Sequence, residues 1–215
     1  MIMKKRLLFI GDSITDCDHL WDFQEKALGN GYVRMISEYM DKLCGGYEVI
    51  NCGFNGFTTG DVLHYWQRNG KALRPDVVTV LAGVNDIAEY FDMDYTGGMW
   101  RFSNNYERLL SAIRAETGAR IVLMEPFVFF HPSYLLEWHV YVREEIRIIQ
   151  GMAAKYHAGY VPLYDGFMKA AKAFGEKSLT VDGMHLTQKG NEILAALWTQ
   201  SVVEKKDGSY RVMGV

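Results

Sequence analysis

The stretch LLFIGDSITD, residues 7–16, joins a short apolar run to a glycine, an aspartate and a serine. Leu7–Ile10 has the length and apolar composition of a buried β-strand. Gly11 permits a tight turn after that strand, and Ser13 can begin a helix there. The hydroxyl of Ser13 is then either a nucleophile or a helix N-cap. Both interpretations stay open, because the G-x-S-x-G nucleophile motif would need a glycine where Thr15 stands.

Apolar runs of strand length alternate along the chain with longer segments of helical period. The five runs are Leu7–Ile10, Tyr47–Asn51, Val77–Leu81, Ile121–Met124 and Tyr160–Leu163. The helical segments are Tyr32–Leu43, Thr59–Asn69, Asn104–Glu116 and Leu135–Tyr156, with two more after the fifth run, the last near Thr187. This alternation predicts an α/β fold with a five-stranded parallel sheet between two layers of helices. Such sheets bind ligands beyond the carboxyl ends of their strands.

The composition predicts one globular domain that spans residues 1–215. Of the 215 residues 49% are hydrophobic, which is enough for a sizeable core. Lys205–Val215 is polar, and we expect it to form a mobile tail. The formal net charge of -3 gives no broad basic field, so neither nucleic acid nor an acidic membrane surface is an expected partner.

The N-terminal residues and the cysteines indicate the cellular compartment. Lys4–Arg6 is followed by only four apolar residues, too few for a signal peptide, and no apolar run is long enough to cross a bilayer. The three cysteines, Cys17, Cys44 and Cys52, contain no CxxC pair. We therefore expect a cytoplasmic protein with reduced thiols and no membrane partner.

Groups that can take part in chemistry follow the predicted strands at three further places. Gly56 lies in the turn after the second strand, where its backbone N–H can face an incoming oxygen. Asn85 follows the third strand and offers a side-chain amide donor. Asp182 stands three residues before His185, a spacing that lets the carboxylate hold the imidazole ring. Together with Ser13, these groups can form one site at the carboxyl edge of the sheet.

With these groups in this order, the chain resembles the GDSL or SGNH hydrolase superfamily over nearly its whole length. The blocks that carry the resemblance are Gly11-Asp12-Ser13-Ile14, Gly56, Gly83-Val84-Asn85-Asp86 and Asp182-Gly183-Met184-His185, with Ile14 where the family has leucine. The resemblance implies a flavodoxin-like three-layer α/β/α fold, with Ser13 as nucleophile, His185 as general base and Asp182 orienting the imidazole. It also implies an oxyanion hole formed by the N–H groups of Ser13 and Gly56 and by the amide of Asn85. No cofactor takes part in this chemistry.

A finer resemblance is to intracellular bacterial acetylxylan esterases. It rests on FIGDSITDC (residues 9–17), ALGNGYV (27–33), GVNDI (83–87) and EPF (125–127). The chain departs from many of these relatives after His185, where Leu186 and Thr187 stand in place of Pro and Ser. The resemblance implies a serine esterase that removes short acyl groups, acetyl above all, from carbohydrates such as xylo-oligosaccharides through an acyl-enzyme.

Two other functions remain open. The same residues could serve a lysophospholipase or thioesterase that acts on longer acyl chains, and the fold could carry a non-catalytic carbohydrate-binding protein. Aromatic rings on the loops after the strands can stack on sugars, and the candidates for substrate binding are Trp21, Tyr95, Trp100 and Tyr134. The same rings could instead form contacts between the subunits of a homo-oligomer.

A metal site is a further alternative. The side chains of Asp12, Asp16, Asp18 and Asp86 could supply oxygen ligands to a divalent cation, as in phosphatases. No paired histidine motif stands beside them, and we predict no metal. Asp12 and Asp86 are instead expected to support the neighbouring turns through hydrogen bonds to backbone N–H groups.

Overall fold

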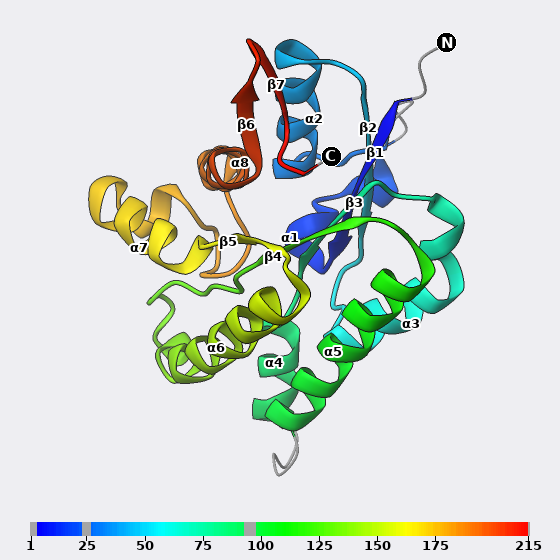
Figure 1. The fold of residues 1–215 in the computed structure, drawn as a ribbon. Coiled ribbons are helices and arrows are strands. Elements are labelled where there is room, and N and C mark those ends of the chain that lie inside the picture. The colour runs from blue at the N-terminus through cyan, green and yellow to red at the C-terminus, as the bar shows by residue number, and fades with distance from the viewer. Residues whose placement is uncertain (1–3, 23–26, 93–97, 215) are drawn as a thin grey trace.

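A parallel sheet forms the centre of the molecule in the computed structural model, which describes residues 4–22, 27–92 and 98–214 (Figure 1). Its strands are β1 (Lys5–Gly11), β2 (Tyr47–Gly53), β3 (Val77–Leu81), β4 (Arg120–Met124) and β5 (Gly159–Val161). They lie in the order β2-β1-β3-β4-β5, and each neighbouring pair is parallel. The carboxyl ends of all five strands therefore meet at one edge of the sheet, as the sequence predicts.

Helices cover both faces of the sheet and complete the predicted three-layer α/β/α arrangement (Figure 1). They are α1 (Ser13–Asp16), α2 (Tyr32–Leu43), α3 (Thr59–Asn69), α4 (Val84–Asp92), α5 (Gly98–Glu116), α6 (Trp138–Tyr156), α7 (Leu163–Phe174) and α8 (Gln188–Val202). Buried residues of α2, α7 and α8 pack in one hydrophobic cluster, and those of α3 and α5 pack in a second. α6 contributes Val142 and Ile146 to the first cluster and Ile149 and Met152 to the second.

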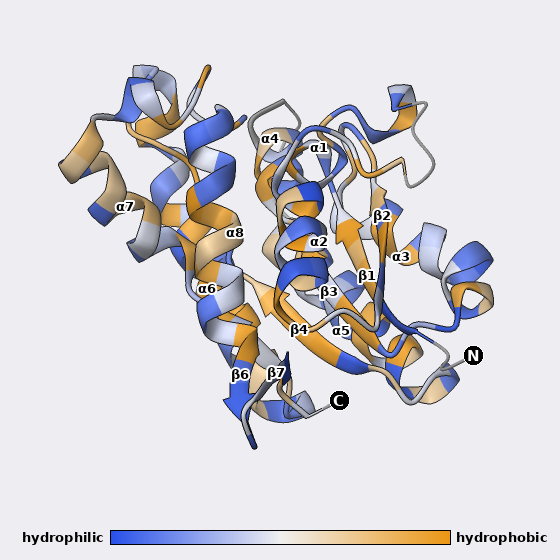
Figure 2. Cartoon of the chain, turned by 90° about the horizontal axis from the view of Figure 1, so that it is seen from above, coloured by the Kyte–Doolittle hydropathy of each residue, from blue (hydrophilic) through white to orange (hydrophobic). Residues whose placement is uncertain are grey.

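The alternation of side chains along each strand separates these two clusters. In β1, Leu7 and Phe9 belong to the cluster with α2 and α8, whereas Leu8 and Ile10 belong to the cluster with α3 and α5. Successive side chains of a strand point to opposite faces, so the continuous run LLFI is explained by a strand that is buried on both sides. Figure 2 shows this pattern as largely orange strands between helices that carry blue, hydrophilic stretches.

Several element boundaries differ from the predicted ones. β5 ends at Val161, because Pro162 precedes α7 and its restrained φ suits the start of a helix. α5 begins six residues before the predicted helix, and the segment predicted to start at Leu135 is divided into a 3-10 turn, Ser133–Leu136, and α6. α4 was not predicted, because its nine residues are too few to show a clear helical period.

The C-terminal segment forms a β-hairpin, so the mobile tail expected over Lys205–Val215 is wrong for the residues that the structure describes. Strands β6 (Val203–Lys206) and β7 (Ser209–Val212) pair antiparallel. Between them, Asp207 and Gly208 have φ angles of 52° and 80°, in the left-handed region that an Asp-Gly hairpin turn requires. Val212 is fully buried, and its N–H donates to the hydroxyl of Tyr47 at 3.1 Å. The Asp-Gly pair and this valine anchor the segment to the domain.

Two further expectations concern thiols and membranes. Cys17, Cys44 and Cys52 are free thiols in the structure. None of the described helices combines the length and the apolar character that crossing a membrane requires.

Candidate active site

Asp12 caps the helix that follows β1 and leaves the hydroxyl of the neighbouring serine available for another bond. Its Oδ1 accepts a hydrogen bond from the N–H of Ile14 at 2.9 Å. Ser13 is the first residue of α1, so the interpretation of Ser13 as the N-cap is wrong. Gly11 lets α1 lie close against the end of β1, because a β-carbon at this position would lie only 2.7 Å from Oγ1 of Thr15 on α1. The hydroxyl is thereby held at the carboxyl end of β1.

The loop before α8 brings a carboxylate and an imidazole together through its own hydrogen bonds. Oδ1 of Asp182 accepts from the N–H groups of Met184 and His185 at 2.9 and 2.8 Å. Its other oxygen, Oδ2, lies 2.6 Å from Nδ1 of His185. Gly183 has a φ of 94°, a conformation that favours glycine, and Thr187 caps α8 as the sequence predicts. The turn and the helix cap together fix the direction of the imidazole.

Ser13, His185 and Asp182 form one hydrogen-bonded line. Nε2 of His185 lies 2.8 Å from Oγ of Ser13, on the side of the ring opposite Asp182. The side chains of His185 and Asp182 are 46% and 43% exposed, so a ligand can reach the line from solvent. Burial opposes ionisation of Asp182, but the hydrogen bonds from the ring and from the backbone outweigh it and lower the pKa of this carboxyl. Asp182 is therefore an anion that can hold the ring and stabilise an imidazolium.

Asn85 links the turn after β3 to the turn after β2. It lies in the first turn of α4, and its Nδ2 donates to the carbonyl oxygen of Phe57 at 3.0 Å. A side-chain amide has two N–H groups, so this bond leaves one of them for a ligand. Gly56, next to Phe57, is exposed and has a φ of 76°. The structure thus ties Asn85 to the loop that contains Gly56.

Two buried aspartates make the supporting hydrogen bonds expected of them. Asp86 accepts from the N–H and the hydroxyl of Thr59 at 2.9 and 2.6 Å, which joins the start of α4 to the start of α3. Asp12 holds the start of α1 in the same way. Burial raises the pKa of each carboxyl to about 7, against the hydrogen bonds that they accept. Both turns therefore rest on carboxyl groups that are partly protonated near neutral pH.

Glu145 is a third buried carboxyl near these turns, and it is not among the site residues predicted from the sequence. It lies on α6 and is fully buried, and neither of its oxygens has a hydrogen-bond partner among the residues that the structure describes. It occupies the space that a β-carbon on Gly83 would need, directly before α4. Burial, and then the charges of Asp86 and Asp12, raise the pKa of Glu145 well above its usual value. In the sequence, Glu145 can be noticed as an acidic residue next to the apolar positions of α6.

Three of the four aspartates of the metal hypothesis have other partners, and the fourth, Asp18, is exposed. Besides the bonds of Asp12 and Asp86, Oδ1 of Asp16 lies 2.5 Å from Nδ1 of His19. This pair has the same three-residue spacing as Asp182 and His185, but its side chains are only 2% and 9% exposed. The sequence analysis did not predict it as a site. Within the described parts of the chain, no three His, Cys, Asp or Glu side chains are arranged to hold a metal ion.

Three of the four aromatic candidates for substrate binding are described, and all three are exposed. The exposed fraction is 73% for Trp21 and Trp100 and 56% for Tyr134. Tyr95 lies outside the described residues. Exposed rings suit a sugar or a second subunit equally well, so the role of these residues stays a prediction.

Comparisons with known proteins show which family the chain belongs to. A model of the GDSL-like lipase/acylhydrolase family matches residues 9–193. An acetylxylan esterase from Geobacillus stearothermophilus is 27% identical over 206 residues, which cover 92% of this chain and 94% of that protein. An isoamyl acetate-hydrolyzing esterase 1 homolog from Bos taurus is 26% identical and covers 95% of this chain and 83% of that protein. The crystal structure of a GDSL-like lipase from Parabacteroides merdae, 25% identical, superimposes with a TM-score of 0.84 and covers 93% of this chain and 96% of that one.

We predict that the protein loses stability as the pH rises from about 5 to about 8, and that Glu145→Gln reduces this loss. Between the usual pKa values near 4 and the raised values, the folded protein keeps protons on Glu145, Asp12 and Asp86 that the unfolded chain releases. Unfolding therefore becomes more favourable as the pH rises. Thermal unfolding midpoints across this range measure the slope, with Glu144→Gln on the same helix as the matched control. An unchanged slope in Glu145→Gln would contradict a buried, protonated Glu145.

Proposed function

This chain belongs to the GDSL-like lipase/acylhydrolase family, and we propose that it is a serine esterase that removes acetyl and other short acyl groups from carbohydrates such as xylo-oligosaccharides. The observation that carries the proposal is the line of hydrogen bonds from Ser13 through His185 to Asp182 at the carboxyl edge of the sheet. An alcohol, an imidazole and a carboxylate in this arrangement are the groups that acyl transfer through a covalent intermediate needs.

In the proposed reaction, His185 accepts the proton of Ser13 while Oγ attacks the carbonyl carbon of the ester. The tetrahedral intermediate collapses when His185 gives that proton to the oxygen of the leaving sugar, and the acyl group stays on Ser13. Water then loses a proton to His185 and attacks the acyl-enzyme, which releases the carboxylic acid and restores the serine hydroxyl. Asp182 takes no proton, because its part is to orient the ring and to stabilise the imidazolium.

The negative charge on the tetrahedral oxygen needs hydrogen-bond donors that are in place before the substrate arrives. We assign this role to the N–H groups of Ser13 and Gly56 and to the amide of Asn85. The bond from Asn85 to Phe57 supports the assignment, because it holds the amide beside the Gly56 turn. Donors that need no reorientation stabilise a developing charge more than mobile donors do.

Two relatives support acetate as the acyl group. The names acetylxylan esterase and isoamyl acetate-hydrolyzing esterase both describe an acetate ester, but the alcohols differ. The carbohydrate part of the proposal rests on the first relative and on the exposed rings of Trp21, Trp100 and Tyr134, which can stack on a sugar.

We expect acetate release from acetylated xylo-oligosaccharides and a fall in kcat/KM as the acyl chain of nitrophenyl esters lengthens. Initial rates on acetate, butyrate and octanoate esters, with direct detection of acetate, measure both. A preference for octanoate would favour a lysophospholipase or thioesterase and overturn the acetyl proposal. If no ester is turned over and an organophosphonate does not label Ser13, the hypothesis that remains is a non-catalytic carbohydrate-binding protein.

The variants Ser13→Ala and His185→Ala should be nearly inactive, and Asp182→Asn should lose less activity. In triads of this kind the nucleophile or the base contributes on the order of 10⁶-fold to kcat and the acid on the order of 10⁴-fold. Ser209→Ala, which changes an exposed serine on β7, serves as the control for the substitution itself. Turnover in Ser13→Ala at the level of Ser209→Ala would refute the assignment of the nucleophile.

Asn85→Ala should lower kcat about 10²–10³-fold, or about 2.7–4 kcal/mol, with a much smaller change in KM, because the amide binds the oxyanion only in the transition state. Steady-state kinetics separate the two constants, and organophosphonate labelling of Ser13 shows whether the nucleophile is still in place. A rise in KM with unchanged kcat would instead make Asn85 a substrate-binding residue.

A further inference from the structure

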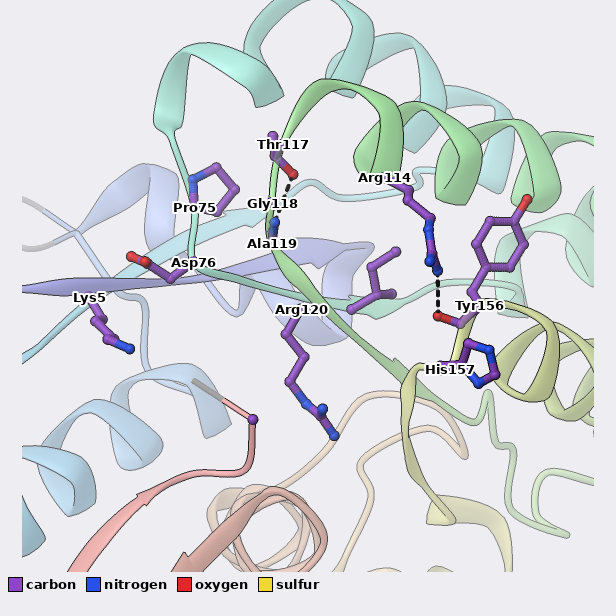
Figure 3. A pocket seen from close by; sticks show the side chains of 12 residues that line it. Lys5, Pro75, Asp76, Arg114, Thr117, Gly118, Ala119, Arg120, Tyr156 and His157 are labelled. Atoms are coloured by element: carbon purple, nitrogen blue, oxygen red, sulfur yellow. Dashed lines mark hydrogen bonds between the residues drawn. The ribbon is translucent and has the colours of Figure 1, made fainter.

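Glu176 is a charged residue outside the triad that is tied to residues 182–185, the catalytic loop. It begins the 3-10 turn Glu176–Ser178. Its carbonyl oxygen accepts from the N–H of Thr180 at 3.0 Å, and the hydroxyl of Thr180 donates to the carbonyl oxygen of His185 at 2.8 Å. The charged side chains in Figure 3 are different, because they surround a hollow at the amino edge of the sheet whose described lining contains no residue of this loop.

The side chain of Glu176 holds the segment that follows β4, mainly by its backbone. Oε1 accepts from the N–H of Phe130 at 3.3 Å, and Oε2 accepts from the N–H of His131 at 3.1 Å. Nδ1 of His131 lies 3.0 Å from the same Oε2. The carboxylate is half-buried, whereas the ring of His131 is exposed. Two of these three contacts therefore do not depend on which side chains stand at positions 130 and 131.

The same segment contacts the catalytic loop at Gly183. The N–H of Phe129 donates to the carbonyl oxygen of Gly183 at 2.9 Å. A β-carbon at Gly183 would lie only 2.4 Å from the carbonyl oxygen of His131, so the two stretches of backbone are in direct contact. Residues 129–131 therefore link the carboxylate of Glu176 to the catalytic loop.

Hydrophobic burial does not hold the segment at this point. Residues 127–129 are fully buried, but residues 130–134 are exposed before Leu135 is buried again. Without Glu176, the N–H groups of Phe130 and His131 would face water, and backbone that is held only by water opens at a low cost in free energy. Glu176 thus supplies fixed contacts where the chain leaves the core and reaches Gly183.

We propose that Glu176 is a positioning residue for the acyl transfer proposed above: it holds residues 129–131 against Gly183 and so keeps the imidazole of His185 in line with Ser13. Nε2 of His185 lies 2.8 Å from Oγ of Ser13, and a small rotation of the catalytic loop would lengthen this distance. A general base must lie within hydrogen-bond reach of the proton that it accepts, and a displacement of about 1 Å can cost on the order of 10²-fold in rate. This role rests on the proposed function, but the position of the imidazole can be measured without turnover.

Glu176→Ala should lower kcat by about 10–100-fold and leave KM nearly unchanged, because it displaces the base and not the groups that bind the substrate. Glu176→Gln keeps one acceptor oxygen and should lose less activity. His131→Ala keeps both backbone contacts and should retain most of the activity. Steady-state rates on an acetate ester, well below the unfolding midpoint of each variant, measure these effects. Glu38→Ala, which changes an exposed glutamate on α2, is the control.

Proton NMR spectra test the position of the imidazole in the absence of substrate. The proton between Nδ1 of His185 and Oδ2 of Asp182, which lie 2.6 Å apart, should give a low-field signal that is missing from His185→Ala. We expect this signal to shift or broaden in Glu176→Ala and to stay in place in Glu38→Ala. A wild type that shows the signal but hydrolyses no ester would contradict the proposed function alone, and the spectra would then decide on Glu176.

Unchanged kcat and an unchanged signal in Glu176→Ala, with only a lower unfolding midpoint, would show a purely structural role and overturn the proposal. A higher KM at constant kcat would overturn it as well, because Glu176 would then act on substrate binding. An equal loss of activity in His131→Ala would assign the effect to the ring of His131 and not to the backbone that Glu176 holds. If Glu176→Ala does not fold, Glu176→Gln takes its place in both measurements.

Discussion

The hydrogen bond from the N–H of Ile14 to the carboxyl of Asp12 determines what the rest of the site can do. A helix N-terminus needs an acceptor, and a serine at that place commonly supplies one with its own oxygen. Because Asp12 supplies it here, Oγ of Ser13 is left to meet His185 at 2.8 Å. Burial disfavours the charge of Asp12, but a positive charge on His185 lowers the pKa of this carboxyl.

The site has two halves that are stabilised in different ways. The turns after β2 and β3 are joined by bonds from Asn85 to Phe57 and from Thr59 to Asp86. The N–H of Phe54, just after β2, donates to the carbonyl oxygen of Gly11 at the end of β1. The loop of Asp182 and His185 is organised mainly by its own carboxylate, which accepts from its own backbone and holds its own imidazole. The bond between His185 and Ser13 connects the two halves. A serine esterase mechanism needs this division, because the donors stay fixed while the imidazole exchanges protons.

The sequence predicted those parts of the fold and site that depend on local chemistry. Continuous apolar runs of strand length predicted the strands, and the three-residue spacing of Asp182 and His185 predicted a pair that a single turn can close. The parts that were missed depend on contacts between distant segments. The bond between Ser13 and His185 joins positions 172 residues apart, and Glu145 is buried against Gly83 on another element. The C-terminal hairpin was missed although its signal is local. The Asp-Gly pair favours a hairpin turn, but the polar composition of the segment led us to expect a mobile tail.

The two edges of the sheet carry different ionisable groups. The carboxyl edge holds the buried acids Asp12 and Asp86, whereas the amino edge presents Lys5 and Arg120. The seven residues of β1 span roughly 23 Å at about 3.3 Å per residue, several times the Debye length of about 8 Å in physiological salt. Exposed charges at one edge are therefore largely screened from the other.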